Sequence, residues 1–306
     1  MSSTTGHTTV SVDLDDVACY HAIHGLPPPT DAQRALVLQR CLPRFLELFA
    51  EHKVKATFFV VGRDLARELA TAGAGTGLLR RALAEGHELA NHSFDHDYDM
   101  QSWSSADIYR DLAKCDKLLR HIGAHPQGFR APGYLHHERM LAQVAALGYR
   151  YDSSSLPSPT YYLAKRSMLA WMEHRGRKSS SPRGGWRSFF GSAWPRFLPE
   201  LGLWEFPIGV SGILRLPMVG TALLAAPKRL SAALRHRALV QPVLHLQLHG
   251  IDLADPGLGG DGYDPTLLER QPELRVSLDH RRDALAELFS HRGGGLNIAA
   301  VLGTNG

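Results

Sequence analysis

Two histidines four residues apart, His92 and His96, end the segment 87–96. Neutral imidazole is a common protein ligand for Zn²⁺ and for the neighbouring transition metals. Two imidazoles do not complete a metal site, so a third ligand and the groups that move protons must come from elsewhere in the chain. Taken alone, the pair also fits a polar surface loop.

Other polar residues follow predicted strands. In a parallel α/β barrel the carboxyl ends of the strands meet at one face, and catalytic groups gather there. One carboxylate and two imidazoles with open positions make a hydrolytic metal site, because the metal lowers the pKa of bound water towards neutrality. A second carboxylate can then accept a proton, and a histidine can donate one. The candidates are Asp13, Asp15, Asp16, His92, His96, Arg130 and His249.

The segments that must position these residues alternate between two patterns. Short β-branched or apolar runs predict strands, and apolar residues at helical spacing predict helices. This alternation favours a parallel sheet, open or closed as a barrel. We expect strands at 8–13, 56–62, 87–92, from 128, and at 149–152, 203–208, 243–250 and 296–302. We expect helices at 31–52, 63–85 with a loop at 73–77, 104–121, 138–147 and, for the most part, 264–291. Residues 19–29 are expected to be irregular, and residues 156–199 are expected to be a functional insertion or to carry short helices.

Composition sets the class of protein. The chain has 306 residues, of which 44% are hydrophobic and 21% charged, as is ordinary for a soluble globular protein. Three cysteines far apart predict neither a disulfide framework nor a cysteine zinc site. Arg215 and Pro217 interrupt the apolar stretch 208–227, which argues against a membrane span. The first seven residues show no signal peptide, so a cytoplasmic location is expected.

The net charge of +4 is unevenly distributed. Residues 165–196 carry eight basic side chains against the single acidic Glu173. Such a cluster is usually a solvated loop, but it also fits an anionic substrate or a membrane surface. Because the apolar stretch 203–227 lies nearby, we consider an enzyme that meets a lipid-linked substrate at the inner membrane face. No nucleic-acid partner is expected.

Four segments resemble the motifs of one family. In chain order, over roughly residues 10–252, they resemble the polysaccharide deacetylases of the NodB-homology group, also called carbohydrate esterase family four. The resemblance implies a deformed, partly open (β/α) barrel as a single domain, 1–306, with an insertion-rich region at 156–230. The segments are 11–16 (Ser-Val-Asp-Leu-Asp-Asp), 92–96 (His-Ser-Phe-Asp-His), 130–134 (Arg-Ala-Pro-Gly-Tyr) and 246–250 (Leu-Gln-Leu-His-Gly).

The resemblance also implies roles for individual residues. Asp13 would be the general base, held by Arg130, and His249 the general acid. A backbone N–H near Tyr134 would stabilise the oxyanion of the tetrahedral intermediate. Zinc is the first metal expected, and such a site also admits Co, Ni, Mn or Fe. The implied metal ligands are Asp15, His92 and His96, and the candidate substrate contacts are Tyr134, His21, His24 and Trp204.

The first motif departs from the family pattern, which has two adjacent aspartates followed by glycine. Two registers therefore stay open: Asp13 as base with Asp15 on the metal, or Asp15 as base with Asp16 on the metal. We prefer the first, because Asp13 and Asp15 share a face of a strand and a variant branch of the family carries Asp-x-Asp. The family's Asp-Trp motif has no clean match. Glu205 is either a neighbour that tunes His249 or a buried acid at a strand end.

The function expected from these residues is metal-dependent hydrolysis of an amide. The most specific reading is removal of an N-acetyl or N-formyl group from a sugar, a lipid-linked sugar or a sugar-containing metabolite. A hydrolase of cyclic amides such as allantoin or imides is the first alternative. A catalytically inactive binding protein is the second.

Overall fold

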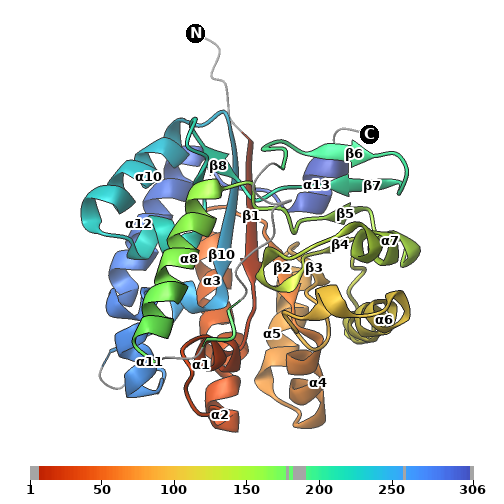
Figure 1. Cartoon of the computed structure of the whole chain (residues 1–306), viewed down its shortest axis with the longest axis horizontal. Coiled ribbons are helices and arrows are strands. Elements are labelled where there is room, and N and C mark those ends of the chain that lie inside the picture. The colour runs from red at the N-terminus through yellow and green to blue at the C-terminus, as the bar shows by residue number, and fades with distance from the viewer. Residues whose placement is uncertain (1–6, 177–178, 182–190, 258–259, 304–306) are drawn as a thin grey trace.

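The computed structural model describes residues 7–176, 179–181, 191–257 and 260–303 (Figure 1). The strands are β1 His7–Asp13, β2 Thr57–Val60, β3 Glu88–Asn91, β4 Gly128–Phe129, β5 Tyr151–Asp152, β6 Arg196–Leu198, β7 Leu203–Glu205, β8 Val210–Ser211, β9 Leu216–Pro217 and β10 Val243–His249. The α-helices are α1 Val17–Ile23, α2 Asp31–Arg34, α3 Leu42–Glu51, α4 Gly62–Ala70, α5 Ala74–Ala84, α6 Ser105–His121, α7 Glu138–Ala146, α8 Pro159–His174, α10 Lys228–Val240, α11 Pro265–Arg270, α12 Leu278–Arg292 and α13 Ile298–Gly303.

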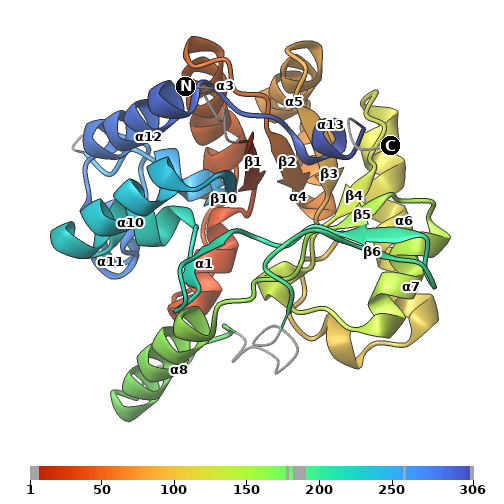
Figure 2. The same cartoon turned by 90° about the horizontal axis from the view of Figure 1, so that it is seen from above.

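One curled sheet organises the described part of the chain. Its eight strands follow the order β10-β1-β2-β3-β4-β5-β7-β6, and β6 is the antiparallel edge. The helices lie around the outside of the sheet (Figure 2). This is the deformed, incompletely closed (β/α) barrel that the sequence predicts, with the carboxyl ends of β1, β3, β4 and β10 at one face.

Strand β1 is the centre of the arrangement. Residues 8–13 of this strand are all buried, as expected of a parallel strand that is covered on both faces. β1 pairs with β10 along its whole length, and the register sets Asp13 directly beside His249. On its other side Asp13 is paired with Phe59 of β2. The first and the last of the four motif segments, 11–16 and 246–250, are therefore neighbours in the sheet.

The prediction of a final strand at 296–302 is wrong, because this segment forms α13. Asn297 caps the helix, because its Oδ1 accepts the N–H of Ala300 at 2.8 Å. The N–H of Ile298 donates to Thr57 Oγ1 at 2.9 Å. Ile298 and Leu302 are buried against the sheet. A short apolar run does not distinguish a strand from a buried helix, and here the side-chain caps decide.

Helices also occupy parts of three segments for which we expected irregular structure, a loop or an insertion. Helix α1 occupies the start of 19–29, because Asp16 caps it by accepting the N–H of Ala18 at 2.6 Å. The loop predicted at 73–77 is only 71–73, since Glu68 accepts the N–H of Gly75 at 2.8 Å and starts α5. Helix α8 fills much of 156–199, of which 177–178 and 182–190 lie outside the described residues.

Two further observations concern the cysteines and the hydropathy of the helices. Cys19, Cys41 and Cys115 are buried and unpaired by disulfides. Within the described ranges, no helix is long and apolar enough to cross a bilayer.

The core beneath β2 contains a histidine that makes the fold sensitive to acid. Burial, with a smaller effect of Lys55, lowers the pKa of His87 to about 4. Its neutral ring packs on Phe49 and Phe58, and its Nδ1 accepts the N–H of Ala56 at 3.0 Å. The unfolded chain therefore takes up a proton near pH 6.5, before the folded chain does, and stability falls as the pH drops from about 6.5 to about 4.

We expect His87→Asn, which keeps an acceptor but cannot be protonated, to reduce that loss. Between pH 7 and pH 4 the wild type should lose about 3 kcal/mol more free energy of unfolding than the variant. Urea denaturation at both pH values measures the difference. Parallel pH dependences for the two proteins would show that His87 is not the group responsible.

Candidate metal and catalytic site

Asp15, His92 and His96 meet beyond the carboxyl ends of β1 and β3. Asp15 Oδ1 lies 3.2 Å from His92 Nε2 and 3.1 Å from His96 Nε2. One ligand atom from each residue lies within 4.8 Å of the other two. All three residues are buried, and neither Asp15 Oδ1 nor His96 Nε2 has a regular hydrogen-bond partner. Buried polar atoms are costly unless they are satisfied, so one carboxylate and two imidazoles that converge in this way fit a divalent metal ion.

The protonation states suit this role. Burial by itself raises the pKa of the Asp15 carboxyl, but His96 and His92 outweigh it and hold the pKa well below its usual range. Burial lowers the pKa of His92, but the neighbouring carboxylates of Asp15 and Asp13 raise that pKa overall. The site therefore keeps Asp15 ionised, which is the form that binds a metal.

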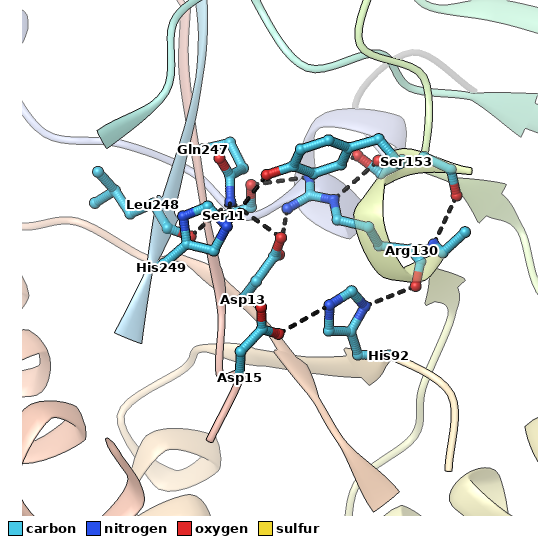
Figure 3. Close-up of polar contacts among 12 residues, drawn as sticks. Ser11, Asp13, Asp15, His92, Arg130, Ser153, Gln247, Leu248 and His249 are labelled. Atoms are coloured by element: carbon cyan, nitrogen blue, oxygen red, sulfur yellow. Dashed lines mark hydrogen bonds and ion pairs between the residues drawn. The ribbon is translucent and has the colours of Figure 1, made fainter. Parts of the chain in front are cut away.

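One tautomer of His92 is fixed by its surroundings. Its Nδ1 lies 2.7 Å from the carbonyl oxygen of Arg130. A carbonyl oxygen only accepts hydrogen bonds, so Nδ1 carries the hydrogen and Nε2 keeps its lone pair towards Asp15 (Figure 3). Metal-binding histidines commonly donate their other ring N–H in this way.

The loop that carries the histidines is held in an unusual backbone conformation. Ser93 and His96 have φ angles of 63° and 51°, which cost about 1–3 kcal/mol each for residues other than glycine. The Asp111 carboxylate accepts the N–H groups of Phe94 and Asp95 at 2.8 and 3.0 Å, and Ser93 Oγ accepts the N–H of His96 at 2.9 Å. Burial raises the pKa of Asp111 to about 6. We did not predict Asp111 to be important; an acid on the buried face of α6 was the available signal.

Asp13 lies at the centre of a second network, drawn in Figure 3. Its Oδ1 accepts from Arg130 Nη1 at 2.6 Å, and its Oδ2 accepts from Gln247 Nε2 at 3.0 Å. The guanidinium of Arg130 is completely buried and also donates to Ser11 Oγ and to Ser153. This network fixes the Asp13 carboxylate beside the metal ligands, where it can exchange a proton. Gln247 was missed, although it shares a strand face with His249 by period two.

His249 lies next to Asp13 in the sheet register and points into the same space. Its Nε2 lies 3.2 Å from the Tyr134 hydroxyl. Its ring accepts the N–H of Asp252, while the Asp252 carboxylate accepts the backbone N–H of His249 at 2.8 Å. Burial and the charge of Glu273 raise the pKa of Asp252. This reciprocal cap orients the imidazole, and its three-residue spacing was visible in the sequence.

Tyr134 reaches the site by its side chain, contrary to the expectation placed on its backbone. Its own N–H donates to the carbonyl oxygen of Ala131 at 3.1 Å within a turn. Gly133 and Tyr134 both have φ angles of 63°, which turn the chain sharply after Arg130. The hydroxyl that faces His249 is consequently the part of Tyr134 available to a substrate.

The open question about the aspartates has a clear geometric outcome. Asp13 and Asp15 both face the histidine site, whereas Asp16 turns the other way. Asp16 Oδ2 pairs with Arg67 at 3.2 Å and with Arg34 at 3.6 Å, and its Oδ1 caps α1. Asp15, and not Asp16, therefore lies with the two histidines, and Asp13 lies beside Arg130.

The remaining predicted contacts divide into two groups. His24 lines the cavity, and its Nε2 lies 2.8 Å from Gln271 Oε1. His21 does not, because its Nδ1 is turned to the Pro27 carbonyl oxygen at 2.6 Å. His21 instead lines a neighbouring hollow together with His96, so its role as a substrate contact stays a prediction.

Trp204 and Glu205 lie on β7, which pairs with β5 and β6 and not with β10. Trp204 packs on Phe197 of β6, outside the cavity lining. Glu205 is nearly buried and pairs with Arg196 and His136, so it is the buried acid and not the partner of His249. Trp204 as a substrate contact therefore stays a prediction, with the side chain outside this cavity.

A cavity of about 620 Å³ lies over the site. Asp13, Asp15, His92, Tyr134 and His249 form its polar end. The space is large enough for a small molecule or for one end of a larger one.

Residues 30–151 match the family model described as polysaccharide deacetylase. A chitooligosaccharide deacetylase of Bradyrhizobium sp. (strain ANU 289) is 33% identical over 110 residues, which are 35% of this chain and 47% of that protein. A chitin deacetylase of Colletotrichum lindemuthianum is 30% identical over 120 residues, 39% of this chain and 47% of that protein. The chain thus matches less than half the length of these relatives. The match to the family model includes His92, His96 and Arg130, but neither Asp13 nor His249.

Solved structures share the architecture. A crystal structure described as a putative polysaccharide deacetylase from Mycobacterium smegmatis superposes with a TM-score of 0.59 at 17% sequence identity, covering 100% of this chain and 92% of that chain. At this identity the likeness concerns the fold.

Proposed function

We propose that this chain, a polysaccharide deacetylase of the NodB-homology type, hydrolyses the N-acetyl or N-formyl amide of a sugar with the help of a divalent metal ion. Asp15, His92 and His96 would hold the metal. The observation that carries the proposal is the pairing of this buried triad with a second buried carboxylate, Asp13, and with His249 at one end of a cavity.

A divalent metal in this site supplies the Lewis acidity that polarises an amide carbonyl and makes water acidic near neutral pH. The chain's own groups perform the proton transfers. Asp13, which Arg130 and Gln247 hold in place, accepts a proton from the attacking water. His249 donates a proton to the departing amine, so the products are a carboxylate and a free amino sugar. The Tyr134 hydroxyl is placed to orient His249 or the substrate.

The relatives support the choice of substrate. The two relatives above are named for deacetylation of chitooligosaccharides and chitin. An N-acylated sugar or a sugar-containing small molecule or lipid is the class that we propose here. The basic and apolar residues of 156–230 support contact with a membrane surface, and a cytoplasmic location at its inner face is part of the same proposal. Zinc is the proposed metal, ahead of Co, Ni, Mn and Fe.

Metal removal tests this function. With N-acetylglucosamine oligomers as substrate, we expect acetate release, and we expect a chelator to lower it by about 100-fold or more. Adding back Zn²⁺ or Co²⁺ should restore the rate, and elemental analysis should find about one metal ion per chain. Full activity in the chelated protein would contradict the proposal. The N-formyl sugar, assayed for formate release, distinguishes the two acyl groups.

A further inference from the structure

We infer that the cavity over the metal site binds an apolar chain attached to the amine-bearing part of the substrate, so that the substrate is an amphiphile. This inference rests on the proposed function for the position of the amide. It is carried by the composition of the cavity lining: besides the catalytic groups and polar side chains such as Lys165, Arg270 and Glu273, most of the lining surface is apolar.

The apolar walls come from segments that follow β7 in the chain. The turn Thr221–Ala225, helix α10 and strand β9 supply most of them, and α8 closes another side. Val219 and Leu234 are buried, whereas Ala222 and Ala225 are partly open to the cavity. Water in contact with such a surface is displaced favourably by alkyl groups, and side chains of this kind make no directional contacts with sugar hydroxyls.

The apolar surface continues out of the cavity. Met168 and Leu230 line the cavity and are still 42% and 47% exposed, so they mark its mouth. On α8, Ala164, Met168 and Trp171 share one face by helical spacing, and Trp171 is 50% exposed. Figure 2 shows α8 projecting away from the sheet beside α1. Large apolar side chains that remain exposed around an opening are typical of ligand grooves.

The hairpin of β8 and β9 extends the same surface. Leu216 and Pro217 line the cavity, and Ile213 and Leu214 at the hairpin tip are exposed. Ser158, at the start of α8, donates to the carbonyl oxygen of Arg215 and ties the hairpin to that helix. The chain that we infer would leave the cavity over this rim.

The position of His249 decides which part of the substrate carries the chain. His249 donates its proton to the amine, so the amine-bearing half of the substrate faces β10. A bridge between Val219 and Gln247 sets the apolar segment beside the same strand. An apolar group on the sugar, and not on the acyl side, therefore runs along Val219 and Ala222 towards the mouth.

A matched series of substrates tests the inference: the methyl, butyl and octyl β-glycosides of N-acetylglucosamine, with the octyl compound kept below its micelle concentration. We expect kcat/KM to rise by about 30-fold or more from methyl to octyl, since each buried methylene contributes to binding. Replacing the acetyl group of the methyl glycoside by octanoyl should not raise kcat/KM. An equal rate for all three glycosides, or a preference for the octanoyl amide, would overturn the inference.

Variants of residues that line the cavity test whether the preference for the octyl glycoside arises there. Ala225→Phe should bring kcat/KM for the octyl glycoside down to about that of the methyl glycoside measured with the same variant. Leu230→Gln at the exposed mouth should act in the same direction and is easier for the fold to accommodate. Ala233→Phe on the exposed side of α10 is the matched control and should change neither rate. Unchanged octyl selectivity in both cavity variants would refute the inference.

A binding measurement separates this inference from the proposed function. Octyl β-glucoside, which has no amide, should bind the wild type at least about tenfold more tightly than Ala225→Phe. Equal binding to both would refute the inference even if the amides are hydrolysed. If none of the amides is hydrolysed but this difference is found, the proposed reaction fails and the apolar-chain site stands.

Discussion

His92→Ala should lose both its metal and its activity. The substitution removes one of three ligands and exposes Asp15 Oδ1 without its imidazole neighbour at 3.2 Å. It also removes the hydrogen bond to the Arg130 carbonyl oxygen. This hydrogen bond joins the loop that carries His92 and His96 to the segment after β4. We expect metal content well below one equivalent and deacetylation lowered by about 10⁴-fold or more, because the chemistry that depends on the metal is lost with it.

Asp16→Asn is the control for that experiment. Asp16 is the immediate sequence neighbour of Asp15, but its carboxylate pairs with Arg67 and Arg34 and caps α1. Asparagine keeps an oxygen for the cap, so metal content and activity should stay near wild type, with a modest loss of stability. Metal loss in Asp16→Asn together with metal retention in Asp15→Asn would establish the opposite register of the aspartates.

Asp13→Asn should separate catalysis from metal binding. The variant side chain has nearly the same shape but cannot take a proton, and a general base contributes about 10²–10⁴ to the rate. We expect kcat to fall by about 10³-fold while one metal ion remains bound. The Arg130 guanidinium then loses its carboxylate in a fully buried site, so the free energy of unfolding should fall by about 3 kcal/mol.

Kinetics, elemental analysis and urea denaturation on the same preparation distinguish these effects. Glu205→Gln is the comparison variant, since it also removes a buried charge from an arginine partner but does not line the cavity. It should lose some stability and keep kcat. A kcat within tenfold of wild type in folded, metal-loaded Asp13→Asn would exclude Asp13 as the base.

Much of the fold could be predicted from local patterns. The spacing of hydrophobic residues predicts these elements. Examples are the buried β-branched run 8–13 and helices with one apolar face such as α3 and α6. Segment 296–302 could not be assigned in this way, because its helix depends on Thr57, a residue far away in the chain. Helix α1 depends on a cap from Asp16, which we considered from the sequence only as a metal ligand.

The sequence by itself determined the chemistry that is available. It supplied His92 and His96, three aspartates, Arg130 and His249, each next to a strand end, and a parallel sheet brings strand ends to one face. Those choices are local, since residue type, spacing and strand period are written in the chain.

Only the tertiary structure decided which of these groups act together. Arg130 holds Asp13 while Arg67 and Arg34 draw Asp16 away, and these partners come from other elements. Glu205 pairs with Arg196 and His136, and Trp204 packs on Phe197, so neither residue lines the cavity. The histidines with which we began remain the central pair, and their cavity continues into apolar walls from α8 and α10 that no single segment specifies. Contacts between distant segments depend on packing, which sequence periodicity does not encode.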